Sequence, residues 1–193
     1  MRAVLWKRYY RSAVAWCCRY GTRPTVHLEL DPKFRKYPLR FAGQCALVSL
    51  VIVGVLYVLD GVANAAVVGA LGATSFIAFA MPHYRVSKSV YLIGGYLVGV
   101  TVGIVCYWGN ELAQSAELPV GADTLLIVFA ALSTGMAIFF MVILNFEHPP
   151  AAGVALGLVL NRCSWVSVGI VIGGVLLLTA VRRLLKPKLI DLL

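Results

Sequence analysis

The sequence predicts an all-α membrane protein of about six transmembrane elements, one of them short, preceded by an N-terminal amphipathic helix at the membrane surface. Three observations support this prediction. Hydrophobic residues make up 61% of the chain and charged residues 13%, whereas soluble domains carry about 25% charged residues. Beyond residue 40 the apolar residues fall into six runs. Ten of the 17 Lys and Arg residues lie before residue 41, as expected of a segment that meets an anionic membrane surface.

Residues 2–20 have helical periodicity, with Trp and Tyr on one face and Lys and Arg on the other. This pattern is typical of a helix lying in the plane of the membrane surface on anionic lipids. An organelle transit peptide is the alternative, because Glu29 is the first acidic residue, but the aromatic content argues against it. Prolines then mark a polar linker. We therefore expect a basic N-terminal segment (1–40), a membrane domain (41–182) and a basic cytoplasmic tail (183–193).

The apolar runs give the order of the membrane elements. A hydrophilic segment, residues 109–123, separates the third run from the fourth. If the N-terminus is cytoplasmic and every element crosses, 16 of the 17 basic residues lie in the cytoplasm and Arg162 is the exception. We therefore expect a multi-pass protein of a bacterial inner membrane with both termini in the cytoplasm. The runs are Phe41–Leu59, Val62–Met81, Val90–Trp108, Thr124–Leu144, Pro149 to about Cys163, and Trp165–Val181.

The fifth run is too short to cross the bilayer comfortably. From Pro149 to Leu160 it would form ~18 Å of helix, against a hydrocarbon core of ~30 Å. Pro149 and Pro150 suit the first turn of a helix capped by His148. Such a helix would point its positive dipole end and its unpaired N–H groups into the protein, where they attract anions. The alternative is a cytoplasmic turn in which the prolines only stop one helix and start the next.

A weak internal repeat divides the domain into halves. Ile93-Gly94-Gly95 and Ile172-Gly173-Gly174 each follow a glycine-rich element. Halves of three elements would have opposite orientations, which is the inverted-repeat plan of many transporters, and Asn64 would then correspond to His148. The glycine stripes indicate close helix packing, with a glycine-lined pore as the alternative. The stripes are Gly95, Gly99 and Gly103; Gly153 and Gly157; and Gly69 with Ala73.

Other classes of function find little support. The sequence has no visible nucleophile–base pair, metal-ligand set or phosphate-binding loop, so we expect no enzyme, cofactor or metal site. The cysteine count is odd and no C-x-x-C occurs, which favours packing roles over disulfides or zinc. Nucleic-acid binding is not expected, because the chain has no room for a folded basic domain. The cysteines are Cys17, Cys18, Cys45, Cys106 and Cys163.

The segment Glu147-His148-Pro149-Pro150-Ala151-Ala152-Gly153 resembles the signature of the HPP family of integral membrane proteins. Matches at 72–76, 81–82 and 93–95 extend the resemblance to about residues 40–182. The chain has Tyr96 where many bacterial members carry His. The family has been described as having four spans, whereas the charge distribution here favours six. Plant members are associated with nitrite movement across the chloroplast envelope, and most prokaryotic members have no assigned activity.

The resemblance and the short helix together imply a passive or proton-coupled pathway for a small monovalent anion, nitrite being the best candidate. His148 could add positive charge, whereas Glu147 would repel anions. A channel for a small neutral solute and a non-transporting scaffold or sensor are the alternatives. Expected partners are anionic lipids of the cytoplasmic leaflet and further copies of the chain. The site candidates are Glu147, His148, Pro149, Pro150, Ala151, Asn64, Ser75 and Tyr96, with Thr74, Asn145 and Asn161 as further lining groups or else helix caps.

Overall fold

The computed structural model describes residues 36–59, 65–116 and 119–192. The chain divides after Lys36, and the helices below belong to the second unit, Tyr37–Leu193. Within its described part this unit has six α-helices, two 3-10 turns and no strand. The helix predicted over residues 2–20 and the candidate Asn64 lie outside the described residues. The elements are α3 (Pro38–Leu59), α4 (Ala65–Ala80), η2 (Arg85–Ser87), α5 (Ser89–Ser115), α6 (Ala122–Ile143), α7 (Pro149–Leu160), α8 (Trp165–Leu185) and η3 (Lys186–Lys188).

Each predicted membrane element is a helix, and α7 begins at Pro149 with His148 as its N-cap, as predicted. Two helices extend beyond the C-terminal ends of their predicted apolar runs. The helix α5 continues through the polar residues after Trp108 as far as Ser115, and α8 continues to Leu185. The end of an apolar run therefore does not mark the end of the helix in these two cases. By length and composition α5, α6 and α8 could each cross a membrane, whereas the described parts of α3, α4 and α7 form shorter apolar helices.

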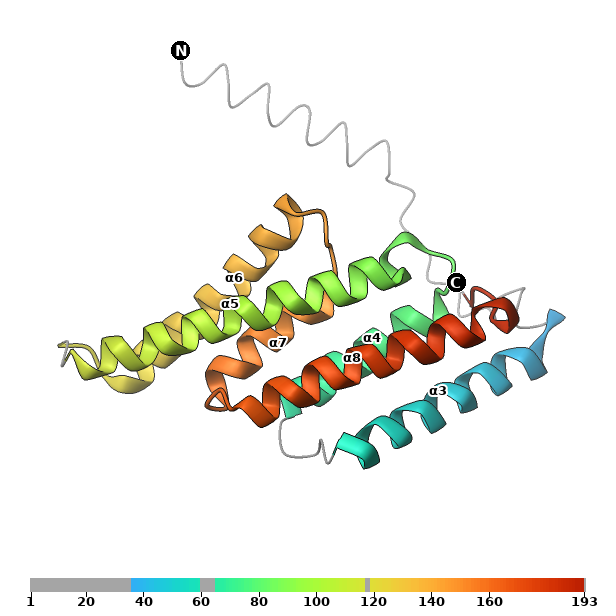
Figure 1. Ribbon diagram of the computed structural model, residues 1–193, viewed down its shortest axis with the longest axis horizontal. Helices are drawn as coiled ribbons and strands as arrows, with labels where there is room; N and C mark the ends of the chain where they lie inside the picture. Colours follow the sequence, from blue (N-terminus) through green and yellow to red (C-terminus); the bar gives the residue numbers. More distant parts are fainter. Residues whose placement is uncertain (1–35, 60–64, 117–118, 193) are drawn as a thin grey trace, which may run out of the picture. The chain divides into compact units, whose positions relative to one another are not determined.

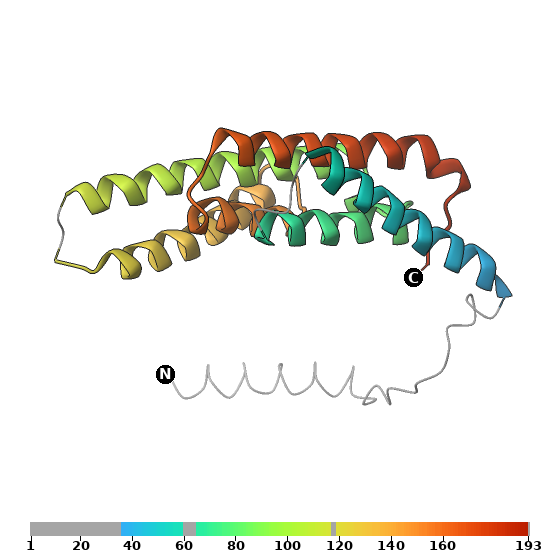
Figure 2. The same ribbon diagram turned by 90° about the horizontal axis from the view of Figure 1, so that it is seen from below.

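The short helix α7 lies among α4, α5 and α6, and α4 lies among α3, α7 and α8. The helices α5 and α6 run side by side and project beyond their neighbours at the end where they are joined (Figures 1 and 2). The core between α4, α5, α7 and α8 combines a few large side chains with many Ala and Val residues. Membrane helices gain such packing from van der Waals contact. The largest fully buried apolar side chains are Tyr96, Phe79, Leu71, Leu92, Leu158 and Leu178.

Several connections and helix ends meet at one end of the bundle. The guanidinium of Arg182 donates a hydrogen bond to the Pro82 carbonyl (2.5 Å), and the backbone N–H of Leu192 donates to the Ala80 carbonyl (2.8 Å). The His83 ring lies 3.3 Å from the Asp191 carboxylate. The segment predicted as a cytoplasmic tail therefore packs, over residues 186–192, against the start of α3 and the α4–α5 connection.

Candidate functional site

The end of α6 fixes the direction in which the chain enters α7. Asn145 has a φ of 60°, a left-handed conformation that Asn tolerates better than most residues. The N–H of Phe146 donates to the Met141 carbonyl and the N–H of Asn145 to the Val142 carbonyl, the two hydrogen bonds of a Schellman cap. The cap turns the chain sharply, and the next three residues lead back to the N-terminus of α7.

The N-terminus of α7 lies inside the bundle rather than at its end. A methyl group added at Gly95 would lie 2.5 Å from the His148 Cβ, so the two backbones are in close contact. Gly95 lies about 9 Å along the helix axis from the first residue of α5, and Thr74 lies a similar distance from the last residue of α4. His148, which contacts both helices, therefore lies well below their ends.

Three helices bring buried polar side chains together at this depth. Thr74 from α4, Tyr96 from α5 and His148 at the cap of α7 are 0%, 0% and 1% exposed. Thr74 Oγ1 lies 2.7 Å from the Tyr96 hydroxyl and 2.9 Å from His148 Nε2. The Tyr96 and His148 rings are tilted against each other with centroids 5.5 Å apart. We call Thr74, Tyr96 and His148 the polar cluster.

The Thr74 hydroxyl carries one proton and can donate to only one of its two partners at a time. Two arrangements use that proton within the cluster. Either Tyr96 donates to Thr74 and Thr74 to His148 Nε2, or His148 Nε2–H donates to Thr74 and Thr74 to Tyr96. The other nitrogen, Nδ1, is buried and has no hydrogen-bond partner among the described residues. The contacts of the ring are neutral, which disfavours a charged imidazolium at this buried position. Exchange between the two arrangements changes the tautomer of His148.

The structure corrects one expectation about α7. The helix was predicted to offer unpaired N–H groups to an anion, but Pro149 and Pro150 carry none and the Ala151 N–H donates to the His148 carbonyl (2.9 Å). Residues 149–151 therefore present no free amide to a solute. Ala151 itself is buried against α5 near Gly99.

The other site candidates lie apart from the polar cluster. The Ser75 hydroxyl donates to the Gly72 carbonyl of its own helix (2.7 Å). Asn161 caps the opposite end of α7, where its side-chain amide donates to the Gly157 carbonyl (2.9 Å). Glu147 and Pro149 are exposed. Pro150 and Pro149 line a hollow of about 520 Å³ between α4 and α7, and its other lining residues are apolar.

A comparison with known protein families identifies the relatives of this chain. The family described as "HPP, transmembrane region" matches residues 32–187. The chain belongs to the HPP family. Neither the search of curated proteins nor the search of solved structures found a match.

The HPP motif thus supplies the His of the polar cluster, and the structure brings the two site candidates His148 and Tyr96 together at Thr74. In this HPP protein the tyrosine hydroxyl and the imidazole both lie within hydrogen-bond distance of the Thr74 oxygen. The helix that carries Ser75 turns by about 100° per residue, so Thr74 reaches the cluster and Ser75 does not.

Sequence reasoning missed Arg85. Its guanidinium donates to the Asn145 side-chain oxygen and to the Tyr91 hydroxyl, both at 2.5 Å. Arg85 thereby ties the α4–α5 connection to the segment that leads into the HPP motif, and it is exposed. The available signal was its place in the basic stretch between two apolar runs, which we read only for membrane orientation.

Proposed function

We propose that this HPP protein moves a small monovalent anion, nitrite being the best candidate, across a bacterial inner membrane. The observation that carries the proposal is the polar cluster, which joins the HPP histidine to hydroxyl groups of two other helices well below the helix ends. Buried polar groups at membrane depth are costly and usually mark a pathway for a solute. In this proposal the anion passes the polar cluster.

The chemistry of the polar cluster suits an oxyanion. Thr74 and Tyr96 are hydroxyl donors, and His148 can donate from either nitrogen. When the Thr74 hydroxyl donates its hydrogen bond to an anion, it no longer donates to His148 Nε2. The ring can then change tautomer, which provides a route for coupling anion movement to proton movement. Arg85, above the segment leading into α7, attracts anions to this end of the protein, whereas the exposed Glu147 opposes them. The balance between these two groups would set the selectivity for charge.

An inverted repeat is part of the proposal and is supported by the pattern of helix contacts. The main contacts are α3 with α4 and α8, α6 with α7 and α5, α4 with α8 and α7, and α5 with α7 and α8. This set is unchanged when α3, α4 and α5 are exchanged for α6, α7 and α8. Under this exchange α4 corresponds to α7, and these two helices provide Thr74 and His148. Transporters with inverted repeats commonly bind their solute between the halves.

The proposed orientation places both termini in the cytoplasm. It is supported by contacts at one end of the bundle, where the start of α3, the α4–α5 connection, the end of α6 and the end of α8 are linked by hydrogen bonds. Elements that alternate in direction across the membrane would bring these segments to one side. The same segments carry Arg40, Arg85, Lys88, Arg183, Lys186 and Lys188, in accord with the positive-inside rule.

Nitrite uptake into proteoliposomes tests the proposal. We expect saturable uptake that is strongly reduced by Thr74→Val, which keeps the shape of the side chain and removes the hydroxyl, and by His148→Gln. Tyr96→Phe should have a smaller effect, because Thr74 retains its hydrogen bond to His148. Ser75→Ala is the matched control, since the Ser75 hydroxyl bonds within its own helix. Equal uptake by the wild type and by folded Thr74→Val protein would contradict a role for the polar cluster.

A channel for a small neutral solute is the second candidate. It is favoured by the absence of a free amide at the start of α7 and by the neutral hydroxyls of the polar cluster. The same liposomes, tested with urea and with water by light scattering, separate the two candidates. Solute flux without nitrite flux would favour the neutral channel, and no flux of any solute would favour a scaffold or sensor.

A further inference from the structure

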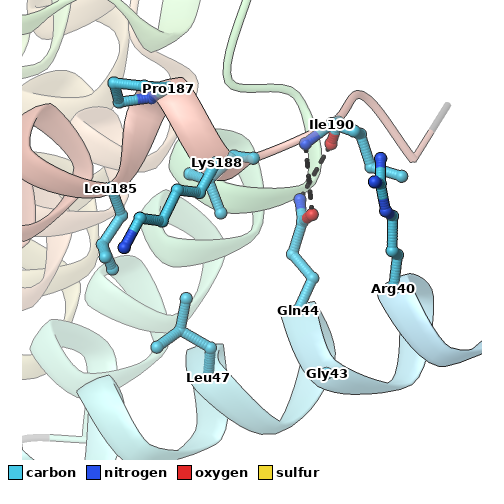
Figure 3. Close-up of a pocket in the computed structure, with 9 residues that line it drawn as sticks. Arg40, Gly43, Gln44, Leu47, Leu185, Pro187, Lys188 and Ile190 are labelled. Carbon is cyan, nitrogen blue, oxygen red and sulfur yellow. Dashed lines mark hydrogen bonds between the residues drawn. The ribbon is translucent and has the colours of Figure 1, made fainter.

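A second hollow, distant in the sequence from the HPP motif, lies between the start of α3 and the segment that follows α8 (Figure 3). Its volume is about 520 Å³. Helix α3 contributes Arg40 and Leu47 to its lining, and the C-terminal segment contributes Leu185 and Lys188. The hollow combines two cations with an apolar wall, and none of the described residues that line it is acidic.

The hollow is held in shape by Gln44. Its side-chain amide donates to the Ile190 carbonyl (2.8 Å) and also to the Phe79 carbonyl, and its oxygen accepts from the Ile190 N–H (3.3 Å). Gln44 is 6% exposed, so this link is buried. It holds the C-terminal segment against both α3 and α4. In the close-up, Arg40 and Lys188 flank the two hydrogen bonds between Gln44 and Ile190 (Figure 3).

Both cations remain available to a ligand. Arg40 and Lys188 are exposed, and the Arg40 guanidinium rests over the Tyr37 ring, 5.5 Å from its centroid. Long basic side chains of this kind place their apolar stems on protein and their charges in the headgroup region. Leu47 and Leu185 extend the wall of the hollow with apolar surface. The two exposed cations lie on either side of the Gln44–Ile190 pair (Figure 3). A phosphate over that pair would have a cation on each side, and an acyl chain along the leucines would cover the apolar wall.

We infer that this hollow binds the phosphate of an anionic phospholipid, with part of an acyl chain against the Leu47 side. A free phosphate has the same charge but would leave the apolar wall uncovered, which favours the lipid. The inference rests on the hollow and its charges, and it stands or falls independently of the proposed transport function.

Thermal unfolding of the full-length protein in an uncharged detergent tests the inference. The protein is titrated with phosphatidylglycerol, with phosphatidylcholine and with glycerol 3-phosphate. The test variant is the double substitution Arg40→Gln and Lys188→Gln. The matched control is Arg183→Gln with Lys186→Gln, which removes the same charge from exposed residues outside the lining of the hollow. Both variants keep all the basic residues of positions 1–36.

We expect phosphatidylglycerol to raise the unfolding temperature more than phosphatidylcholine does. The half-maximal phosphatidylglycerol concentration should rise roughly tenfold in the test variant, since each basic contact with an anionic headgroup adds measurably to binding, and should stay unchanged in the control. An unfolding temperature equal to wild type without added lipid shows that the test variant is folded. If phosphatidylglycerol binding is weakened equally in both variants, the effect comes from general surface charge, and the proposed site is wrong. Stabilisation by glycerol 3-phosphate as strong as that by the lipid would overturn the assignment to a phospholipid.

Discussion

The glycines of the α5 stripe and the first glycines of the α4 and α7 stripes, Gly69 and Gly153, have opposite surroundings. Methyl groups added at Gly95 and Gly99 would collide with the backbone side of α7, at His148 and at the Ala151 carbonyl oxygen. Methyl groups added at Gly69 in α4 or at Gly153 in α7 would meet no atom within 4 Å. The packing interpretation of the glycine stripes is therefore confirmed for α5, while Gly69 and Gly153 face open space.

This difference shows what the α5 stripe does for the site. Because α5 lacks side chains at these positions, α7 can approach it closely along its whole length and begin next to Gly95, inside the bundle. The polar cluster depends on that approach, since Tyr96 and Thr74 reach His148 only while α7 is held against α5. Alanine substitutions at these glycines test the comparison directly.

Gly99→Ala should have the largest effect. The added methyl would overlap the Ala151 carbonyl oxygen, a backbone atom that cannot turn aside. We expect the free energy of unfolding to fall by ~3 kcal/mol, at the upper end of ordinary overpacking, together with a poor yield of folded protein. Thermal unfolding and size-exclusion chromatography of the purified variant measure this. Wild-type stability would show that α5 and α7 are not packed in this way.

Gly95→Ala should act on the site more than on the fold. The added methyl lies 2.5 Å from the His148 Cβ and 3.1 Å from the Phe146 carbonyl oxygen, so His148 has to shift away from α5. We expect a stability loss of about 2 kcal/mol and loss of the saturable solute flux, because the hydrogen bond between Thr74 and His148 breaks.

Gly94→Ala is the matched control for Gly95→Ala. Its methyl would lie 2.6 Å from Cδ1 and 2.7 Å from Cγ of Phe146, so that side chain has to move, but none of its three nearest atoms belongs to His148. We expect flux to survive in this variant. If Gly94→Ala and Gly95→Ala lose flux equally, the effect comes from general loosening of α5 and not from displacement of His148.

Gly103→Ala should have a modest effect. The methyl would lie 3.1 Å from the Ala155 Cα and 3.1 Å from a terminal carbon of Leu158, which is tight but requires only a small adjustment. We expect a loss of about 1 kcal/mol, because the overpacking is partly offset by the higher helix propensity of Ala. A loss in thermal unfolding as large as that of Gly99→Ala would mean that α7 cannot move even slightly.

The sequence was sufficient to predict the order of the helices and the start of α7, because apolar runs and prolines are local signals. It was not sufficient to predict which polar groups meet. Thr74 and Ser75 are both candidates from the sequence, and only the rotation of α4 in the bundle decides which of them contacts His148. The expectation of free amides failed because two consecutive prolines remove the very groups that a helix start normally offers. The surroundings of each glycine likewise depend on which face the neighbouring helix covers.

Gly153→Ala should have the smallest effect and bears on the route of the solute. Its methyl enters the hollow that Pro149 and Pro150 line, without touching other atoms. We expect unfolding stability to stay the same or rise by up to about 1 kcal/mol, the helix propensity difference between Gly and Ala. Flux should be unchanged, because the polar cluster is not part of the lining of that hollow. A stable Gly153→Ala protein that has lost flux would instead make the hollow part of the pathway and Gly153 a pore residue. Transport would then require the glycines that face open space, rather than those of α5 that pack against α7.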